Sequence, residues 1–198
     1  MTGLARLRDA VRGLTRLAEA GAGQERWLSE GADLLRDLVS ADDWLPAPFA
    51  ECGPGYRQYL LHCDPLERFS LVAFVWGPGA STPVHDHTVW GLVGMLRGEE
   101  ISTEMHHGPP MVPGRVDRLR PGEVLAIRPE DNDIHRVENA LADRASISVH
   151  IYGANIGAVR RHVFDPATGA RREFISGYSN GLVPNFWDRS KEPAAGAT

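Results

Sequence analysis

The chain has 198 residues, which is enough for one domain with a substantial core and too few for a second full domain. Its formal net charge of -5 argues against nucleic acid or an anionic membrane as a partner, because both favour clustered Lys and Arg. No apolar run approaches the length of a membrane span, no signal peptide is recognisable, and two cysteines make no disulfide framework. A cytoplasmic protein is therefore expected.

The N-terminal region predicts two amphipathic helices. Apolar residues recur at three- and four-residue spacing from Leu4 to Leu17. A second helix is predicted from about Gln24 to Val39. We expect both helices to cover the end or face of a sheet.

Short apolar runs separated by Gly and Pro follow Pro46, and the 21 glycines and 14 prolines of the chain indicate many tight turns. Regularly spaced short strands with such turns are typical of a sandwich or small barrel. The predicted strands are Tyr56–His62, Ser70–Trp76, Val89–Arg97, Glu100–Met105, Val116–Leu119, Val124–Ile127, His135–Glu138 and Ala145–Tyr152.

The whole chain, 1–198, is expected to be a single mainly β domain. Its predicted parts are N-terminal helices over 1–42, a β-barrel over 43–178 and a C-terminal tail over 179–198. In the tail, Phe186 and Trp187 are expected to fold back onto the body, and the last eight residues to be disordered.

The most informative residues are two histidines one residue apart, His85 and His87, followed further along by His135. In a regular strand the first two would share a face, roughly 7 Å apart along the chain. A third imidazole from a facing strand would complete a mononuclear metal site. Ordinary paired or exposed histidines are the alternative. Zinc accepts the same three ligands as iron, so the number of histidines does not identify the metal.

The stretch from Gly79 through the two histidines to Gly98 resembles the first motif of the cupins, a family of small β-barrels. The ligating Glu of that motif is missing, because its position falls at Gly91 or Leu92. A site of neutral imidazoles leaves a divalent ion its full charge and favours an anionic ligand such as a thiolate.

The segment His85-Asp86-His87-Thr88, the following Val89 to Gly98 and the region from about Tyr56 to Tyr152 resemble the thiol dioxygenases, the cysteine dioxygenase family of cupins. The resemblance implies that the three histidines hold Fe(II). It also implies that a substrate thiolate binds the iron and that O2 adds to sulfur to form a sulfinate.

A strict alternation in Ser148-Val149-His150-Ile151-Tyr152 puts Ser148, His150 and Tyr152 on one face of a strand. On the metal-facing side these residues would form a relay that orients the imidazole and points the phenol toward substrate. The thiol dioxygenases carry such a triad. A strand with an outward polar face is the alternative. A hydrolase nucleophile is disfavoured, since Ser148 lacks a Gly-x-Ser-x-Gly turn.

Two departures bear on the substrate. Mammalian cysteine dioxygenases cross-link a cysteine to the active-site tyrosine, whereas the matching position here is Gly91. Those enzymes also hold the amino-acid carboxylate with an arginine, where this chain aligns Gln58, with Arg57 next to it. The Gln-bearing subgroup resembles 3-mercaptopropionate dioxygenase. Arg160 or Arg161 is then the candidate partner of the substrate carboxylate.

Trp90 is a further candidate, as a wall of the substrate pocket. The leading hypothesis is an Fe(II) dioxygenase of a small thiol carboxylate, with 3-mercaptopropionate first and cysteine or mercaptosuccinate as alternatives. A non-catalytic metal-binding cupin that senses a ligand, or a zinc hydrolase or isomerase, is the rival outside this class. The sequence sets no oligomeric state.

Overall fold

The computed structural model of the protein describes residues 3–188. Its N-terminal part is helical, and the predicted second helix is confirmed as an unbroken helical stretch from Gln24 to Val39 with one π-helical turn in its middle. The helical elements are α1 (Ala5–Glu19), α2 (Gln24–Arg26), the π-helix η1 (Trp27–Gly31), α3 (Ala32–Val39) and the short 3-10 helix η2 (Ala47–Phe49).

The remainder is built from two antiparallel sheets, with strand orders β1-β2-β9-β4-β7 and β11-β10-β3-β8-β5-β6. The first sheet contains β1 (Tyr56–Cys63), β2 (Ser70–Trp76), β4 (Gly91–Arg97), β7 (Val124–Ile127) and β9 (Ser146–Tyr152). The second contains β3 (Val84–His85), β5 (Glu100–His106), β6 (Val112–Leu119), β8 (His135–Asn139), β10 (Arg161–Phe164) and β11 (Arg171–Phe174).

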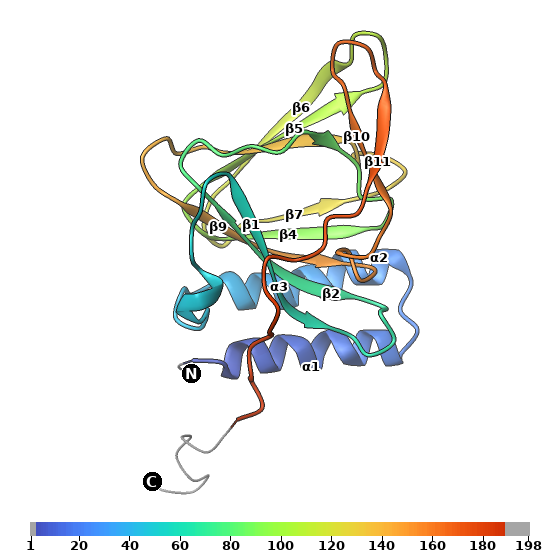
Figure 1. Cartoon of the computed structure of the whole chain (residues 1–198). Helices are drawn as coiled ribbons and strands as arrows, with labels where there is room; N and C mark the ends of the chain where they lie inside the picture. The colour runs from blue at the N-terminus through green and yellow to red at the C-terminus, as the bar shows by residue number, and fades with distance from the viewer. Residues whose placement is uncertain (1–2, 189–198) are drawn as a thin grey trace, which may run out of the picture.

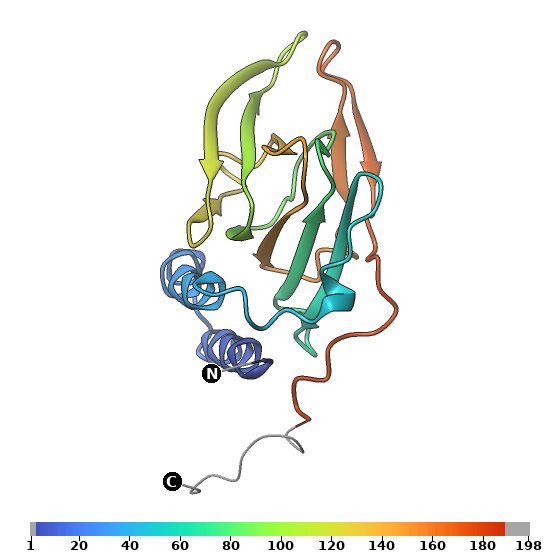
Figure 2. The same cartoon turned by 90° about the vertical axis from the view of Figure 1, so that its left-hand side faces the viewer.

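The two sheets face each other, and the helices lie against the outer side of the five-stranded sheet (Figures 1 and 2). The mainly β architecture with N-terminal helices packed on it is therefore confirmed. The barrel expected over 43–178 takes the form of these two facing sheets.

Alternation along the strands of the first sheet separates a helix-facing core from an inner face. On β9, Ile147, Val149 and Ile151 join the cluster that includes the helices, together with Leu35 of α3. Close approach of α3 to β4 requires Gly94, because a Cβ there would lie 2.8 Å from the Leu35 side chain. The opposite side of the sheet is thereby left to line the space between the two sheets.

The hairpin of β10 and β11 was not predicted from the sequence. These four-residue strands pair with each other, and β10 also pairs with β3 (Figure 1). Half of their residues are charged and they show no apolar alternation, so the pattern that reveals the other strands is missing. This hairpin brings Arg161 to the inner side of the fold.

The segment after β11 runs along the free edge of β1. Its Ser179 and Asn180 hydrogen-bond to Gln58 and Leu60 of that strand, at 2.8–3.1 Å. Further on, Phe186 is buried against the helix-facing core, as expected, whereas Trp187 is 54% exposed. The expectation of disorder for the last eight residues concerns positions outside the described ones.

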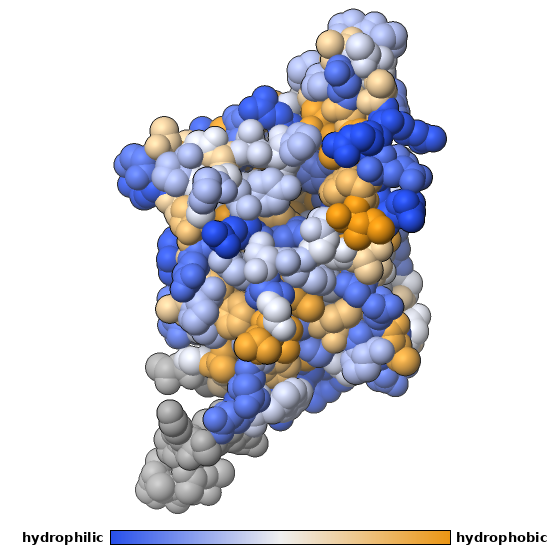
Figure 3. Space-filling model, in the orientation of Figure 1, coloured by the Kyte–Doolittle hydropathy of each residue, from blue (hydrophilic) through white to orange (hydrophobic). Residues whose placement is uncertain are grey.

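The face of the molecule in Figure 3 carries hydrophilic and hydrophobic residues side by side, with hydrophobic ones gathered in the lower half of the view, at the height of the helices. Within residues 3–188, none of the helices has the length and apolar character needed to cross a bilayer.

Candidate metal centre

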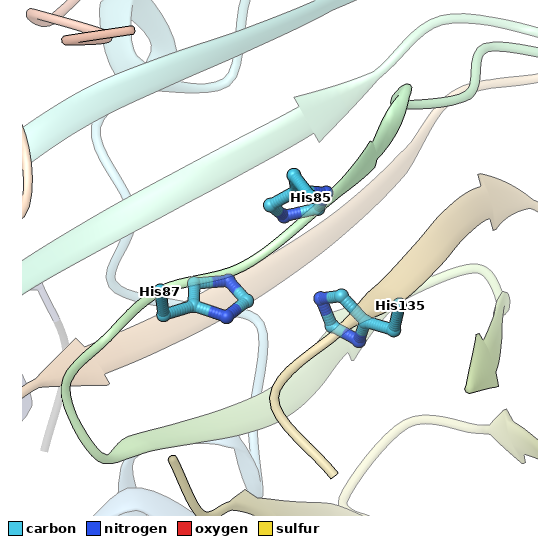
Figure 4. Close-up of side chains that lie close together, drawn as sticks. All are labelled: His85, His87 and His135. Carbon is cyan, nitrogen blue, oxygen red and sulfur yellow. The ribbon is translucent and has the colours of Figure 1, made fainter. Parts of the chain in front are cut away.

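Three histidine side chains converge between the sheets (Figure 4). His85 ends β3 and lies opposite His135 of β8 in the strand register, while His87 lies just beyond the end of β3. The three rings are 4.9–5.0 Å apart, centroid to centroid. One nitrogen from each ring lies within 4.8 Å of the others, so a single ion can reach all three.

No regular strand runs through both His85 and His87, because β3 ends at His85. The chain bends after His87, where Thr88 has a φ of 61°. Asp133 stabilises the bend, since its carboxylate accepts hydrogen bonds from the backbone N–H groups of His87 (2.8 Å) and Thr88 (2.9 Å). The His85 and His87 rings lie 4.9 Å apart, centroid to centroid.

Each histidine has its Nδ1 occupied by a fixed neighbour. Nδ1–H of His85 donates to the Pro83 carbonyl at 3.1 Å, and that of His87 donates to the Asp133 carboxylate at 3.0 Å. Nδ1 of His135 lies 2.9 Å from the Ser102 hydroxyl. All three Nε2 atoms are thus available to an ion, as is usual for metal-binding histidines with an outer hydrogen-bond partner.

The fit to a metal rests on one atom in particular. Nε2 of His135 is buried and has no hydrogen-bond partner. A buried unsatisfied polar atom costs about 1–3 kcal/mol unless something binds it. A divalent cation among the three Nε2 atoms would satisfy it.

Burial keeps these imidazoles neutral. Removal from water lowers the pKa of His85 to about 4 and holds the pKa values of His87 and His135 well below their usual range. The proximity of other imidazoles adds to the effect on His87 and His135. At neutral pH the site is therefore a set of uncharged nitrogen donors, the protonation state that metal binding requires.

Next to this cluster, Ser148, His150 and Tyr152 lie on the inner face of β9 and form a hydrogen-bonded row. The Tyr152 hydroxyl is 2.8 Å from Nδ1 of His150, and Nε2 of His150 is 2.8 Å from the Ser148 hydroxyl. The Tyr152 ring stacks on His87 at 5.3 Å, which connects the row to the three histidines. Burial raises the pKa of Tyr152 and lowers that of His150 to about 3, so both are neutral.

Gly91 lies beside Tyr152 in the register of β4 and β9. A Cβ at this position would come within 3.1 Å of the Tyr152 ring. The glycine therefore gives the tyrosine room and offers no sulfur for a thioether bridge.

A cavity of about 230 Å³ opens beside the histidines and the tyrosine. It lies below the roughly 300–1,000 Å³ typical of small-molecule sites, so it suits a very small ligand. Gln58 and Arg161, two of the residues singled out from the sequence, line it, while the neighbouring Arg57 is exposed and does not. The other lining residues are Tyr56, Phe74, Trp76, Thr82, Pro83, His85, His87, His135, Val137, His150, Tyr152, Val163, Arg172, Phe174 and Ser176.

The expectation that Trp90 walls this pocket is wrong. Its ring stacks on Trp27 at 4.9 Å and packs against the core between the helices and the sheet. The residue lies just before β4, on the side of the sheet that faces away from the cavity.

Arg161 brings a buried positive charge to the cavity wall. It is 4% exposed, donates to the Ser176 hydroxyl at 2.7 Å and lies 4.8 Å above the Phe174 ring. Its Nε has no partner, and no carboxylate of the described residues lies within ion-pair distance of it. Burial lowers its pKa. A buried unpaired cation is costly, and an anionic ligand would offset that cost.

Sequence reasoning missed three polar residues around this site. Asp133 and Ser102 fix the rings of His87 and His135, and Glu100 is buried near Ser148. The position of Asp133, two residues before a proposed ligand, was a usable signal. The strand pattern around Ser102 and Glu100 gave none.

Comparison with known proteins identifies the class. The family profile described as cysteine dioxygenase type I matches residues 56–165. This range contains the three histidines, the Ser148–His150–Tyr152 row, Gln58 and Arg161. The chain belongs to the cysteine dioxygenase type I family, and with the two facing sheets this confirms the predicted cupin fold.

Solved structures of cupins are also similar to this chain. A cupin 2 domain-containing protein from Halorhodospira halophila is 21% identical, with a TM-score of 0.41 over 53% of this chain and 68% of that one. A cupin 2 conserved barrel protein from Rhodopseudomonas palustris is 14% identical, with a TM-score of 0.44 over 56% and 67%. A cupin-2 domain from Rhodospirillum rubrum is 17% identical, with a TM-score of 0.44 over 60% and 73%.

Proposed function

We propose that the protein is an Fe(II)-dependent thiol dioxygenase that converts a small mercapto-carboxylate to its sulfinate, RSH + O2 → RSO2H. The proposed substrate is 3-mercaptopropionate. The observation that carries the proposal is the pairing, in one small cavity, of three neutral histidines with the buried, unpaired Arg161.

His85, His87 and His135 would hold the ion through their Nε2 atoms. A ferrous ion bound there would supply open positions for a thiolate and for dioxygen, with a net charge that favours the thiolate. Asp133, Ser102 and the Pro83 carbonyl keep the rings aimed at the ion through their Nδ1 atoms.

Arg161 would bind the substrate carboxylate. Hydrogen bonds to charged groups contribute about 1.5–3 kcal/mol, and the contribution is greatest where water is excluded. A carboxylate held at Arg161 leaves the thiol end of a short chain free to reach the histidines, which line the same cavity.

Gln58 lines the cavity with a neutral amide, one of whose hydrogens is already engaged by the Gly177 carbonyl. None of the described residues that line the cavity is an Asp or a Glu. A cysteine substrate would therefore find no anionic partner for its ammonium group, which favours a thiol acid without one.

Tyr152 would position the substrate and the reacting oxygen by hydrogen bonding, with its hydroxyl oriented by His150 and Ser148. In this arrangement the row holds a proton close to the reacting atoms while burial excludes bulk water. This role makes the tyrosine a binding group as well as a proton carrier.

Mercaptosuccinate is the second candidate substrate, and Arg172 is the observation that favours it. This exposed arginine of β11 also lines the cavity, so a second carboxylate would find a cation there. Substitution of Arg172 by Met would then reduce kcat/KM for mercaptosuccinate and leave that for 3-mercaptopropionate unchanged.

The test is oxygen uptake by iron-loaded protein, with sulfinate formation measured alongside it, using 3-mercaptopropionate, L-cysteine and mercaptosuccinate. We expect the highest kcat/KM for 3-mercaptopropionate and no turnover by a His135→Ala variant. Turnover of none of these thiols would refute the proposal. Stoichiometric thiol binding without turnover would instead indicate a sensor. Zinc rather than iron in protein purified without added metal would direct attention to hydrolytic chemistry.

A further inference from the structure

A buried carboxyl group lies at the far end of the Tyr152–His150–Ser148 row. Glu100, the first residue of β5, is 1% exposed, and its Oε2 has no hydrogen-bond partner. A carboxyl group in such surroundings is unusual, because acidic side chains are almost never fully buried unless paired. The metal site does not explain it, since the group is not part of the histidine cluster.

The surroundings of Glu100 contain few groups that could interact with it. In the strand register it lies opposite Leu119 of β6 and Asn139 of β8, neither of which titrates. From the facing sheet, the Ser148 hydroxyl of β9 and the Trp76 indole of β2 lie close enough to lower the pKa of Glu100. On β4, the residue opposite Ser148 is the apolar Met95.

The titratable groups nearest to Glu100 along the row are His150 and Tyr152. The neighbouring carboxylate of Glu99 is paired with Arg118 at 2.6 Å. Burial raises the pKa of Glu100 to about 7, against the smaller lowering effect of Ser148 and Trp76. The carboxyl group can therefore change its protonation state near neutral pH, whereas the buried His150, whose pKa is about 3, stays neutral.

The number of protons available along the row links the protonation state of Glu100 to the orientation of the Tyr152 hydroxyl. The Ser148 hydroxyl has one proton to give, and it already accepts from the Trp76 indole N–H at 3.0 Å. When Glu100 is ionised, that proton is drawn to the carboxylate. His150 must then donate from Nε2 to Ser148, its Nδ1 becomes an acceptor, and the Tyr152 proton points at Nδ1 and away from the cavity.

When Glu100 is protonated, every hydrogen bond along the row runs in the opposite direction. Its O–H donates to Ser148, and the Ser148 proton goes to Nε2 of His150. Nδ1 of His150 then carries the ring proton and donates it to the Tyr152 oxygen. The Tyr152 proton is left free to point into the cavity.

We propose that Glu100 is the fourth member of the row, a positioning residue whose protonation decides whether Tyr152 presents a proton or a lone pair to the cavity. Its action passes through Ser148 and His150, so it does not touch substrate. The inference deepens the proposed function and rests on its tyrosine, yet it is independent of which thiol is used.

A concerted shift along the row would deliver one proton without leaving a charge on the intermediate residues. The Glu100 proton moves to Ser148, the Ser148 proton to Nε2 of His150, the Nδ1 proton to Tyr152, and the Tyr152 proton to an acceptor in the cavity. Glu100 ends ionised and the acceptor ends protonated, so the proton count balances.

The His150 tautomer provides a direct test that needs no turnover. In the full-length protein loaded with zinc as a diamagnetic ion, 15N NMR reports which nitrogen of His150 carries the proton, with the signal assigned by its loss in His150→Gln. We expect Nε2–H above pH 8, Nδ1–H below pH 6, and Nδ1–H throughout in Glu100→Gln, whose amide donates to Ser148 at every pH. An unchanged tautomer in the wild-type protein across this range would overturn the proposal.

A second test uses the pH profile of kcat/KM in the iron-loaded enzyme. We expect an ionisation near pH 7 in the wild type that is absent in Glu100→Gln and present in the matched control Glu99→Gln. Should Glu100→Gln fail to fold, Ser148→Ala breaks the same connection and is expected to remove the ionisation. Retention of the ionisation in the tested variant would overturn the inference. Absence of oxygen uptake by the wild-type enzyme would instead count against the proposed function. It would leave the inference about Glu100 to the tautomer measurement, which does not need turnover.

Discussion

Replacement of Glu100 by Gln is expected to change how the stability of the protein depends on pH. The pKa of Glu100 rises from its ordinary value of 4.5 to about 7 on folding, mainly through burial. Between these two values the folded state binds more protons than the unfolded state, so stability falls as pH rises. Each pKa unit corresponds to about 1.36 kcal/mol, so the carboxyl group destabilises the fold by about 3 kcal/mol above pH 7 and not at all below pH 4.

Glu100→Gln keeps the shape of the side chain and removes the ionisation. We therefore expect the free energy of unfolding of the variant, relative to the wild type, to increase by about 3 kcal/mol between pH 4 and pH 8. Urea unfolding of metal-free protein at several pH values measures this difference, and all groups common to both proteins cancel. The partly exposed Glu99 provides a control, since Glu99→Gln makes the same chemical change one residue away. A stability difference for Glu100→Gln that is constant across this pH range would refute the reasoning.

Three further outcomes follow from the contacts described above. Asp133→Asn removes the carboxylate that fixes the His87 ring and is expected to weaken metal affinity about 10–100-fold, measured by competition with a chelator. Arg161→Met is expected to lower kcat/KM for 3-mercaptopropionate about 10–100-fold, mostly through KM, because one charge-assisted contact is lost. An equal loss for a thiol without a carboxylate would contradict that role. Leu35→Ala opens a cavity between α3 and the sheet and is expected to lower the free energy of unfolding by about 2–5 kcal/mol in urea.

The elements that the sequence predicts well are those whose residues alternate strongly. The alternation over Ser148 to Tyr152 correctly separates an inner polar face from a helix-facing apolar one. The convergence of the three histidines also follows from the sequence, because a His-x-His pair and a distant histidine carry a recognisable pattern.

Other features depend on tertiary contacts that local patterns do not encode. The β10–β11 hairpin has no alternation of apolar and polar residues, so the pairing that brings Arg161 to the cavity is visible only in the structure. Trp90 follows the metal motif directly, yet the chain turns it toward Trp27. Glu100 reads as the polar start of a strand, and only the facing sheet reveals its burial.

The segment that follows β11 joins parts of the molecule that are far apart. It begins at Ser176, which holds Arg161, continues past Gly177, which holds Gln58, and ends with Phe186, whose carbonyl accepts from Arg8 of α1 at 2.8 Å. Residues 176–186 thus connect the wall of the pocket to α1. A protease cut within residues 176–186 is therefore expected to disturb the side of the cavity formed by Gln58 and Arg161, whereas His85 and His135 are held by strand pairing elsewhere in the fold.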